Sequence, residues 1–221
     1  MSPTPETVQA LLNSDDFGER LRGVNQIRTL ETAIASELLQ KAATDQNTRV
    51  RYAAISQLAN LEGVDGAALL PMLRNTLVND PEPDVQAAAA DALGALKLTE
   101  AFEDLKTAYE TNPEWLVTFS IVAALGELGD TRGFEILQSA LESGNELLVT
   151  AAIGSLGELK DDRALPLLLG FVAADDWQIR HRVIQALSQF DTPEAKAAIA
   201  QLSQDKSHIV AEAAKQHMNL S

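Results

Sequence analysis

The residues best suited to recognising a ligand are a few ring-bearing and cationic side chains in a chain that has only two tryptophans. Each tryptophan is followed four residues later by a second ring, Phe119 after Trp115 and His181 after Trp177. Four residues are about one helical turn, so a helix would present both rings of a pair on one face. Arg182 follows His181 and could hold a carboxylate through two parallel hydrogen bonds. Such a set suits a flat conjugated molecule or a helical protein surface.

The sequence that must position these rings repeats itself every 31 to 35 residues. The segment 80–96, for example, recurs 32 residues later as 112–128. Five consecutive copies keep an apolar anchor residue and a leucine eight positions after it. The five anchors, and the degraded copies that open and close the series, are Val50, Val85, Val117, Leu148 and Ile179, with Leu21 first and Val210 last. This regular spacing indicates a repeat protein in which each copy is one structural unit.

Each copy is predicted to form two helices joined by short polar turns. In the second helix of a copy, apolar residues recur at the anchor and at 4, 8 and 11 positions after it, which is the spacing of one helical stripe. A single pair cannot bury its apolar face alone, so successive pairs must stack. We therefore predict an all-α fold, a right-handed α-α superhelix or repeat solenoid of about six helical pairs, forming one domain over residues 1–221.

The ring-bearing residues occupy matching positions in this repeat. Trp115 and Trp177 lie two positions before their anchors, and Tyr52, Phe119 and His181 lie two positions after theirs. These positions face away from the predicted core, and in a solenoid the second helices line the concave binding surface. Alternatively, the rings pack against the next helix and fill space between repeats. The candidate binding residues are Tyr52, Trp115, Phe119, Trp177, His181 and Arg182.

The composition excludes several classes of function. The chain carries 32 acidic and 17 basic side chains, a formal net charge of -15, which disfavours nucleic acid as a partner. It has no cysteine, which excludes disulfides and thiol catalysis by its own residues. Its three histidines are too scattered to predict a metal site, and no motif identifies a catalytic residue. The longest apolar run, 164–174, is too short to insert in a membrane, so we expect a cytoplasmic protein.

The repeat unit resembles the HEAT repeat. The resemblance rests on an Asp-x5-Arg spacing with valine before the arginine, an alanine pair and a Leu-Gly-x-Leu ending, best preserved in segments 45–61 and 80–96. The alanine-rich ending at 124–130 is similar to phycobilisome-associated members of this family, which include bilin lyase subunits and phycobilisome degradation proteins. The chain length and the segments 17–23 and 85–91 favour the degradation members.

This resemblance also implies a structural role for the arginine one position after the anchor. In HEAT-like repeats, that arginine pairs with acidic residues between the helices of neighbouring repeats. Arg51 and Arg180 hold the position here, and the implied acidic partners are Asp45, Asp80 and Asp176.

The function implied by the resemblance is that of a phycobilisome degradation factor. Such a protein would bind phycobiliprotein subunits and promote disassembly of the antenna, with detachment of the bilin chromophore as one route. The ligand or substrate would be a linear tetrapyrrole such as phycocyanobilin, and no intrinsic cofactor is expected. Two alternatives stay open: a bilin lyase subunit that attaches a phycobilin to a phycobiliprotein cysteine, and a generic HEAT-repeat scaffold for another protein. Whether the protein turns over as an enzyme also stays open.

Overall fold

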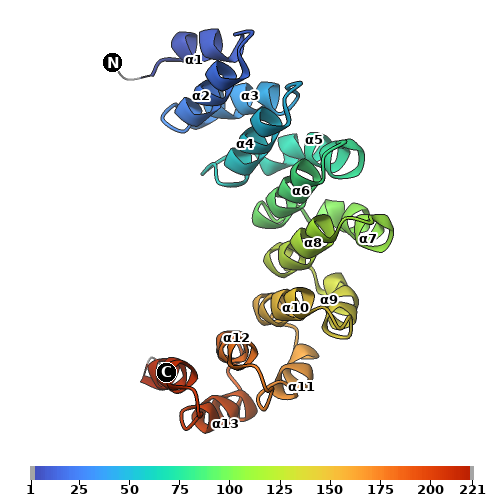
Figure 1. The fold of residues 1–221 in the computed structure, drawn as a ribbon, viewed down its shortest axis with the longest axis vertical. Helices are drawn as coiled ribbons and strands as arrows, with labels where there is room; N and C mark the ends of the chain where they lie inside the picture. Colours follow the sequence, from blue (N-terminus) through green and yellow to red (C-terminus); the bar gives the residue numbers. More distant parts are fainter. Residues whose placement is uncertain (1–2, 220–221) are drawn as a thin grey trace. The chain divides into compact units, whose positions relative to one another are not determined.

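A computed structural model describes residues 3–219, and over this range the chain forms α-helices and two short 3-10 helices but no strand. The predicted all-α repeat solenoid is confirmed. The fourteen α-helices make seven consecutive pairs, one more than the predicted number of about six. In each pair an odd-numbered helix is followed by an even-numbered one, and the even-numbered helices correspond to the predicted second helices (Figure 1).

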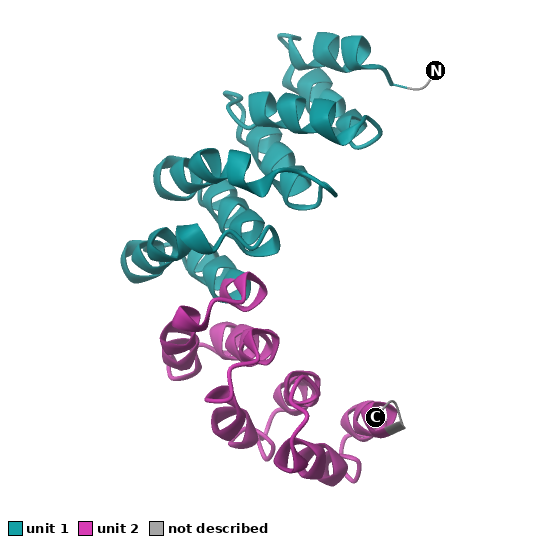
Figure 2. Cartoon of the chain, turned by 180° about the vertical axis from the view of Figure 1, so that it is seen from behind, with its two compact units in different colours: residues 1–124 teal, residues 125–221 magenta. Residues whose placement is uncertain are grey.

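The chain divides into two compact units, residues 1–124 and residues 125–221, and the division falls inside α8 (Figure 2). The helices of unit 1 are α1 Pro5–Leu12, α2 Phe17–Ile27, α3 Thr32–Ala42, α4 Thr48–Ala59, α5 Gly66–Asn79, α6 Pro83–Ala95, the 3-10 helix Thr99–Ala101, α7 Phe102–Thr111 and α8 Trp115–Leu128, whose last turn belongs to unit 2. Unit 2 continues with the 3-10 helix Thr131–Gly133, α9 Phe134–Leu141, α10 Glu146–Leu159, α11 Ala164–Leu169, α12 Trp177–Leu187, α13 Pro193–Leu202 and α14 His208–Asn219. That residues 1–221 form one domain stays a prediction.

The even-numbered helices from α4 to α14 begin at one fixed position of the repeat, two residues before the anchor. Asn47, Asn145 and Asp176 cap three of these helices by accepting hydrogen bonds from first-turn backbone N–H groups. The predicted apolar stripe is buried in all five copies at 4 and 8 positions after the anchor, and in α8 Val117 and Ile121 are fully enclosed. The anchors Leu148 and Ile179 are only half-buried.

The first repeat was placed two residues too late by the sequence pattern. Helix α2 begins at Phe17, which puts Glu19 at the anchor position and Arg20 one position after it. The anchor chosen from the sequence, Leu21, is half-buried and stands two positions after the corrected anchor, where the side chain faces away from the core. The pattern misled because the anchor of this terminal repeat is a glutamate rather than an apolar residue.

A ladder of polar side chains joins successive repeats of unit 1. The Arg20 guanidinium donates to both oxygens of Asp45, at 2.7 and 3.1 Å, and also to the backbone carbonyl of Ser14. Arg51 repeats the arrangement with Asp80, at 2.8 and 2.9 Å. Because both pairs are largely buried, each arginine ties the even-numbered helix of one repeat to the loop of the next. The pairing implied between Arg51 and Asp80 is therefore present, whereas the carboxylate of Asp45 pairs with Arg20.

In the next repeat a glutamine takes the place of the arginine. The Gln86 side-chain amide donates to the carbonyl of Asp80, and its oxygen accepts from Asn112 at 2.7 Å. The neutral amide pair conserves the geometry of the ladder without charge, so the ladder runs across unit 1 from the first repeat to the fourth.

Unit 2 contains one rung of the same kind, and it corrects one implied partner. Arg180 donates to both oxygens of Asp205, at 2.7 and 2.8 Å, and to the carbonyls of Ala174 and Asp175. Asp176, the partner expected from the sequence, instead caps α12 through the Gln178 N–H. The arginine reaches forward to the next repeat because the aspartate of its own repeat is occupied at the helix start.

Glycines set the closest approaches between even-numbered helices. A Cβ added to Gly157 would lie 2.6 Å from the Ala186 Cα, and one added to Gly126 would lie 2.6 Å from the Ser155 Cα. Both glycines stand nine positions after their anchors, and the residue they face stands seven positions after the next anchor. Gly94 stands in the same relation to Ala124 within unit 1. Glycine is required at these contacts because the facing atoms are backbone.

Candidate functional site

Two even-numbered helices begin with an exposed tryptophan. Trp115 begins α8 and is 61% exposed, and Trp177 begins α12 and is 40% exposed. Large rings normally lose most of their water contact in a folded protein. The alternative that these tryptophans fill space between repeats therefore does not describe them, since much of each indole faces solvent.

The corrected register adds a third ring that the sequence pattern missed. Phe17 begins α2, occupies the same repeat position as the two tryptophans and is 44% exposed. Arg20 and Asp45 are 25 residues apart, as are Arg180 and Asp205. This equal spacing could have placed Arg20 at the repeat position of Arg180, and Phe17 would then have matched Trp177.

The rings predicted one turn further along the helices are less uniform. Tyr52 on α4 is 47% exposed, whereas Phe119 and His181, one helical turn after the tryptophans, are half-buried. Within unit 1 the structure thus places Tyr52, Trp115 and Phe119 on the layer of even-numbered helices. Within unit 2 it places Trp177, His181 and Arg182 together at the start of α12. The binding role of all six residues stays a prediction.

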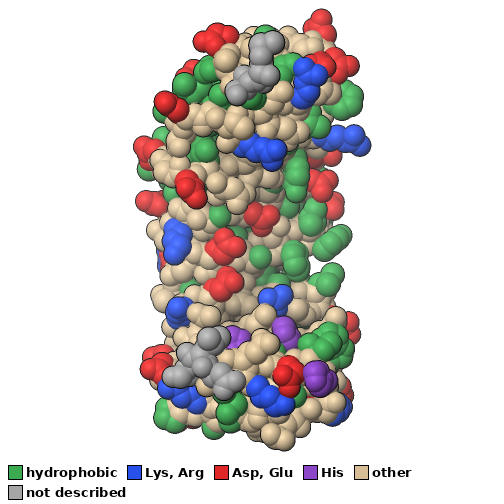
Figure 3. All heavy atoms as spheres, turned by 90° about the vertical axis from the view of Figure 1, so that its left-hand side faces the viewer, with side chains coloured by type: hydrophobic (Ala, Val, Ile, Leu, Met, Phe, Trp, Pro, Cys, Tyr) green, Lys and Arg blue, Asp and Glu red, His purple; other side chains and the backbone are tan. Residues whose placement is uncertain are grey.

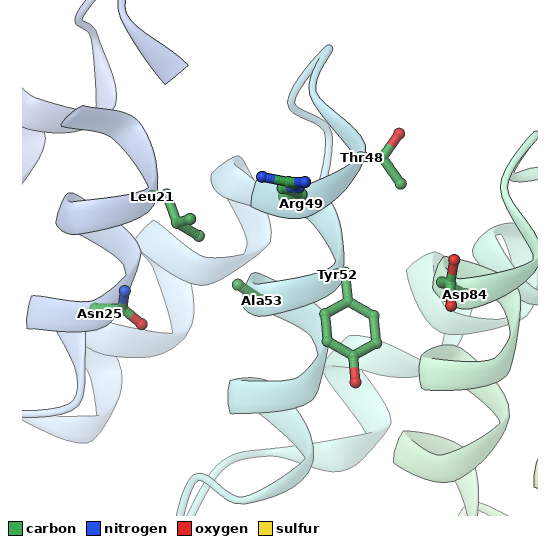
Figure 4. A pocket seen from close by; sticks show the side chains of 7 residues that line it. All are labelled: Leu21, Asn25, Thr48, Arg49, Tyr52, Ala53 and Asp84. Carbon is green, nitrogen blue, oxygen red and sulfur yellow. The ribbon is translucent and has the colours of Figure 1, made fainter. Parts of the chain in front are cut away.

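Tyr52 lines a pocket on this layer in unit 1. The pocket has a volume of about 430 Å³ and draws its walls from α2, α4 and α6. Figure 4 shows Leu21 and Asn25 on α2, the Tyr52 ring in the middle of the group and Asp84 on α6. The remaining lining residues are Thr48, Arg49 and Ala53 of α4. A pocket of this size fits a drug-sized ligand.

Arg182 lies across the neighbouring helix in unit 2. Its guanidinium donates to the Gln185 side chain at 3.2 Å, and its stem runs beside Gly154 of α10. The carboxyl of Glu158 has a raised pKa, caused first by its burial and then by the negative charge of Glu127, while the positive charge of Arg182 opposes the rise. Because the Arg182 side chain is exposed, most of the N–H donors of its guanidinium face solvent, as its predicted role in holding a carboxylate requires.

Figure 3 shows one face of the protein, on which exposed hydrophobic side chains lie among acidic and basic ones. Within residues 3–219 no three His, Asp or Glu side chains gather closely enough to hold a metal ion. In the same part of the chain, none of the helices combines the length and apolar composition needed to cross a membrane.

The exposure of the two indoles can be checked by fluorescence. The variants Trp115→Phe and Trp177→Phe each leave one tryptophan, and both remaining indoles should emit as water-exposed groups. We expect acrylamide to quench Trp115 more strongly than Trp177, because Trp115 is 61% and Trp177 is 40% exposed. Blue-shifted, poorly quenched emission from either variant would show that its ring packs between repeats.

The stacked helical pairs, the arginine–aspartate ladder and the layer of even-numbered helices define a HEAT-repeat solenoid. The sequence profile of HEAT repeats matches residues 67–156 and 135–219, so the chain belongs to the HEAT-repeat family. A comparison with curated protein sequences found no match.

Solved structures with a similar fold include a phycocyanin lyase complex. The complex of CpcE and CpcF of phycocyanin lyase from Nostoc sp. PCC7120 aligns with a TM-score of 0.67 and 23% identity, over 100% of this chain and 94% of that one. Escherichia coli YibA aligns with a TM-score of 0.62 and 13% identity, over 96% of this chain and 80% of that one. An engineered protein aligns with a TM-score of 0.58 and 18% identity, over 97% and 67% of the two chains. At these identities the likeness concerns the fold.

Proposed function

We propose that this protein binds phycobiliprotein subunits through the layer of even-numbered helices and promotes disassembly of the phycobilisome. The observation that carries the proposal is the exposure of Trp115 and Trp177 at one repeat position, where the fold alone would tolerate small polar residues. Exposed tryptophans are the residues that most often anchor a protein–protein interface. The repeat endings and the fold shared with the phycocyanin lyase complex support a bilin-bearing partner.

The proposed action is on the partner's chromophore. Because the chain contains no cysteine, any thioether to a bilin that is made or broken belongs to the phycobiliprotein. In this action the protein would bind a phycobiliprotein, expose its chromophore and promote detachment of the chromophore, and disassembly of the antenna would follow. Attachment of a bilin, the reaction of a lyase subunit, is the second candidate, and the phycocyanin lyase fold favours it.

One experiment distinguishes these actions. The purified protein is incubated with intact phycocyanin and, separately, with apo-subunit plus free phycocyanobilin, and protein-bound chromophore is followed by absorbance after separation. Loss of bound chromophore from phycocyanin supports detachment, and gain on the apo-subunit supports a lyase. If neither preparation associates with the protein on a sizing column, the proposal is wrong. The remaining hypothesis is then that the protein is a HEAT-repeat scaffold for another protein.

The tryptophans provide the matching variants. We expect Trp115→Ala and Trp177→Ala each to weaken association with phycocyanin about tenfold or more, because each removes an exposed anchor. Val78→Ala serves as the control, since Val78 is equally exposed but lies on α5, in the layer of odd-numbered helices. Thermal unfolding should change little in all three. Equal affinities of the tryptophan variants and the control would place the interface elsewhere.

A further inference from the structure

The pocket of unit 1 is lined by polar side chains that have no partner within the described residues. The side chains of Asn25, Thr48, Arg49 and Asp84 make no hydrogen bond or ion pair there, although all four line the same cavity. The ladder arginines a short distance away are fully paired with aspartates. The hydrogen-bonding groups of the pocket are therefore free to act on a ligand.

The cationic group of this pocket is Arg49. It stands one position before its anchor, on the first turn of α4, and its side chain is exposed (Figure 4). A guanidinium holds a carboxylate through two parallel hydrogen bonds, and the Asn25 amide on α2 can donate a further one. This side of the pocket consequently favours a carboxylate.

The opposite side favours a hydrogen-bond donor. Asp84 on α6 carries a carboxylate that can only accept hydrogen bonds, so it would repel a purely anionic ligand. The exposed Tyr52 ring lies between Arg49 and Asp84, and the apolar side chains of Leu21 and Ala53 lie on the side of the pocket toward α2 (Figure 4). Together they suit a flat conjugated body. The pocket is thus complementary to a molecule that combines a carboxylate, a planar apolar body and an N–H group.

We infer that this pocket binds a flat conjugated molecule with carboxylate and N–H groups, that Arg49 holds its carboxylate and that Asp84 accepts its N–H. Linear tetrapyrroles belong to this chemical class, since they combine propionate side chains with pyrrole N–H groups. Their choice as the ligand rests on the proposed function. The inference assigns a ligand-holding role to Arg49, Asn25 and Asp84, three residues outside the set expected from the sequence.

Biliverdin and its dimethyl ester test the inference, because the ester lacks only the free carboxylates. Titration of the full chain with either compound is followed by the change in the compound's visible absorbance. We expect the wild type to bind biliverdin more tightly than the ester, and Arg49→Gln to weaken biliverdin binding about tenfold while leaving ester binding unchanged. Asp84→Asn should weaken the binding of both compounds.

Arg28→Gln is the matched control. Arg28 lies in unit 1 and is exposed, with no side-chain partner in the described part of the chain, but it does not line this pocket. It loses the same charge as Arg49→Gln, so an equal effect of the two variants would show that only net charge matters and would overturn the inference. Circular dichroism should give nearly the same unfolding profile for all variants, because the substituted side chains make no hydrogen bond or ion pair within the described residues.

Two further outcomes separate this inference from the proposed function. If the wild type binds biliverdin but Arg49→Gln binds it equally well, the pocket assignment is wrong while a bilin-binding function stands. If the wild type binds neither compound, the inference is wrong, and association with phycocyanin still decides the proposed function independently.

Discussion

Replacing Arg180 by alanine is expected to lower the free energy of unfolding of unit 2 by about 3 kcal/mol, because it leaves the Asp205 carboxylate buried without its counter-charge. The side chains of this pair are only 4% and 8% exposed, so water cannot replace the lost guanidinium. Arg180 also satisfies the carbonyls of Ala174 and Asp175, which would lose their donors. Urea unfolding followed by circular dichroism, with hydrogen exchange in α12 and α14, measures the loss.

An exposed ion pair of the same unit provides the control. Lys215 and Glu212 lie 2.8 Å apart, and each is about half exposed. Lys215→Ala should therefore change stability by about 0.5 kcal/mol or less. If Arg180→Ala were equally mild, the ladder would contribute little to the stacking of repeats.

The same pair makes stability depend on pH in a defined direction. The Arg180 guanidinium, as hydrogen-bond donor, holds the pKa of the Asp205 carboxyl below its usual range. A carboxyl with a lowered folded-state pKa stabilises the protein above its unfolded pKa of about 4, and this contribution is lost as the pH falls through the folded-state value. Asp205→Asn should accordingly weaken the protein at neutral pH and reduce the loss of stability on acidification.

Replacing Gly157 by alanine is expected to destabilise unit 2 by about 2 kcal/mol, although alanine is the better helix former. The new Cβ would lie 2.6 Å from the Ala186 Cα, 2.8 Å from its Cβ and 3.2 Å from its carbonyl oxygen. These atoms cannot rotate away, so α10 and α12 would have to separate along their whole contact.

Gly154, on the same helix as Gly157, provides a control glycine that does not contact a neighbouring backbone. The nearest atom to its added Cβ is the Arg182 Cδ at 3.6 Å, which is an ordinary contact with a flexible side chain. Gly154→Ala should stabilise the protein by up to about 1 kcal/mol, because only helix propensity changes. The two variants differ by three positions in one helix, and we expect their melting temperatures to move in opposite directions. A shift in the same direction would contradict the packing described here.

Much of the fold follows from the period of the sequence, because an apolar anchor and a leucine eight residues later can only serve a helix packed against its neighbours. From Val50 onward the six anchors all stand at the third residue of an even-numbered helix, as one common register requires. It failed at the first repeat, since a repeat with Glu19 at the anchor offers no apolar signal.

The candidate site was harder to predict than the fold. Position in the repeat indicates which side chains face away from the core, and it singled out Tyr52, Trp115 and Trp177, which are exposed. It could not indicate that Arg49 and Asp84 lie on opposite walls of one pocket, because that depends on how far α4 and α6 stand apart. The partner of Arg180 was assigned wrongly although the register distinguishes the candidates: Asp205 stands five positions before its anchor, as Asp45 and Asp80 do, whereas Asp176 stands three before and caps α12.

The glycine contacts also bear on how such a chain could lengthen or shorten. Where a glycine nine positions after one anchor meets alanine or serine seven positions after the next, as at Gly94, Gly126 and Gly157, the two faces of a repeat are interchangeable in shape. A repeat bounded by such joints could be duplicated or removed and its neighbours would still fit. The first two repeats carry Arg28 and Ala59 at the glycine position, so they do not share this joint. The sixth repeat carries Ser188 at that position. Only the fourth and fifth repeats therefore have such a joint on both sides and are exchangeable modules, whereas the opening repeats form a fixed end.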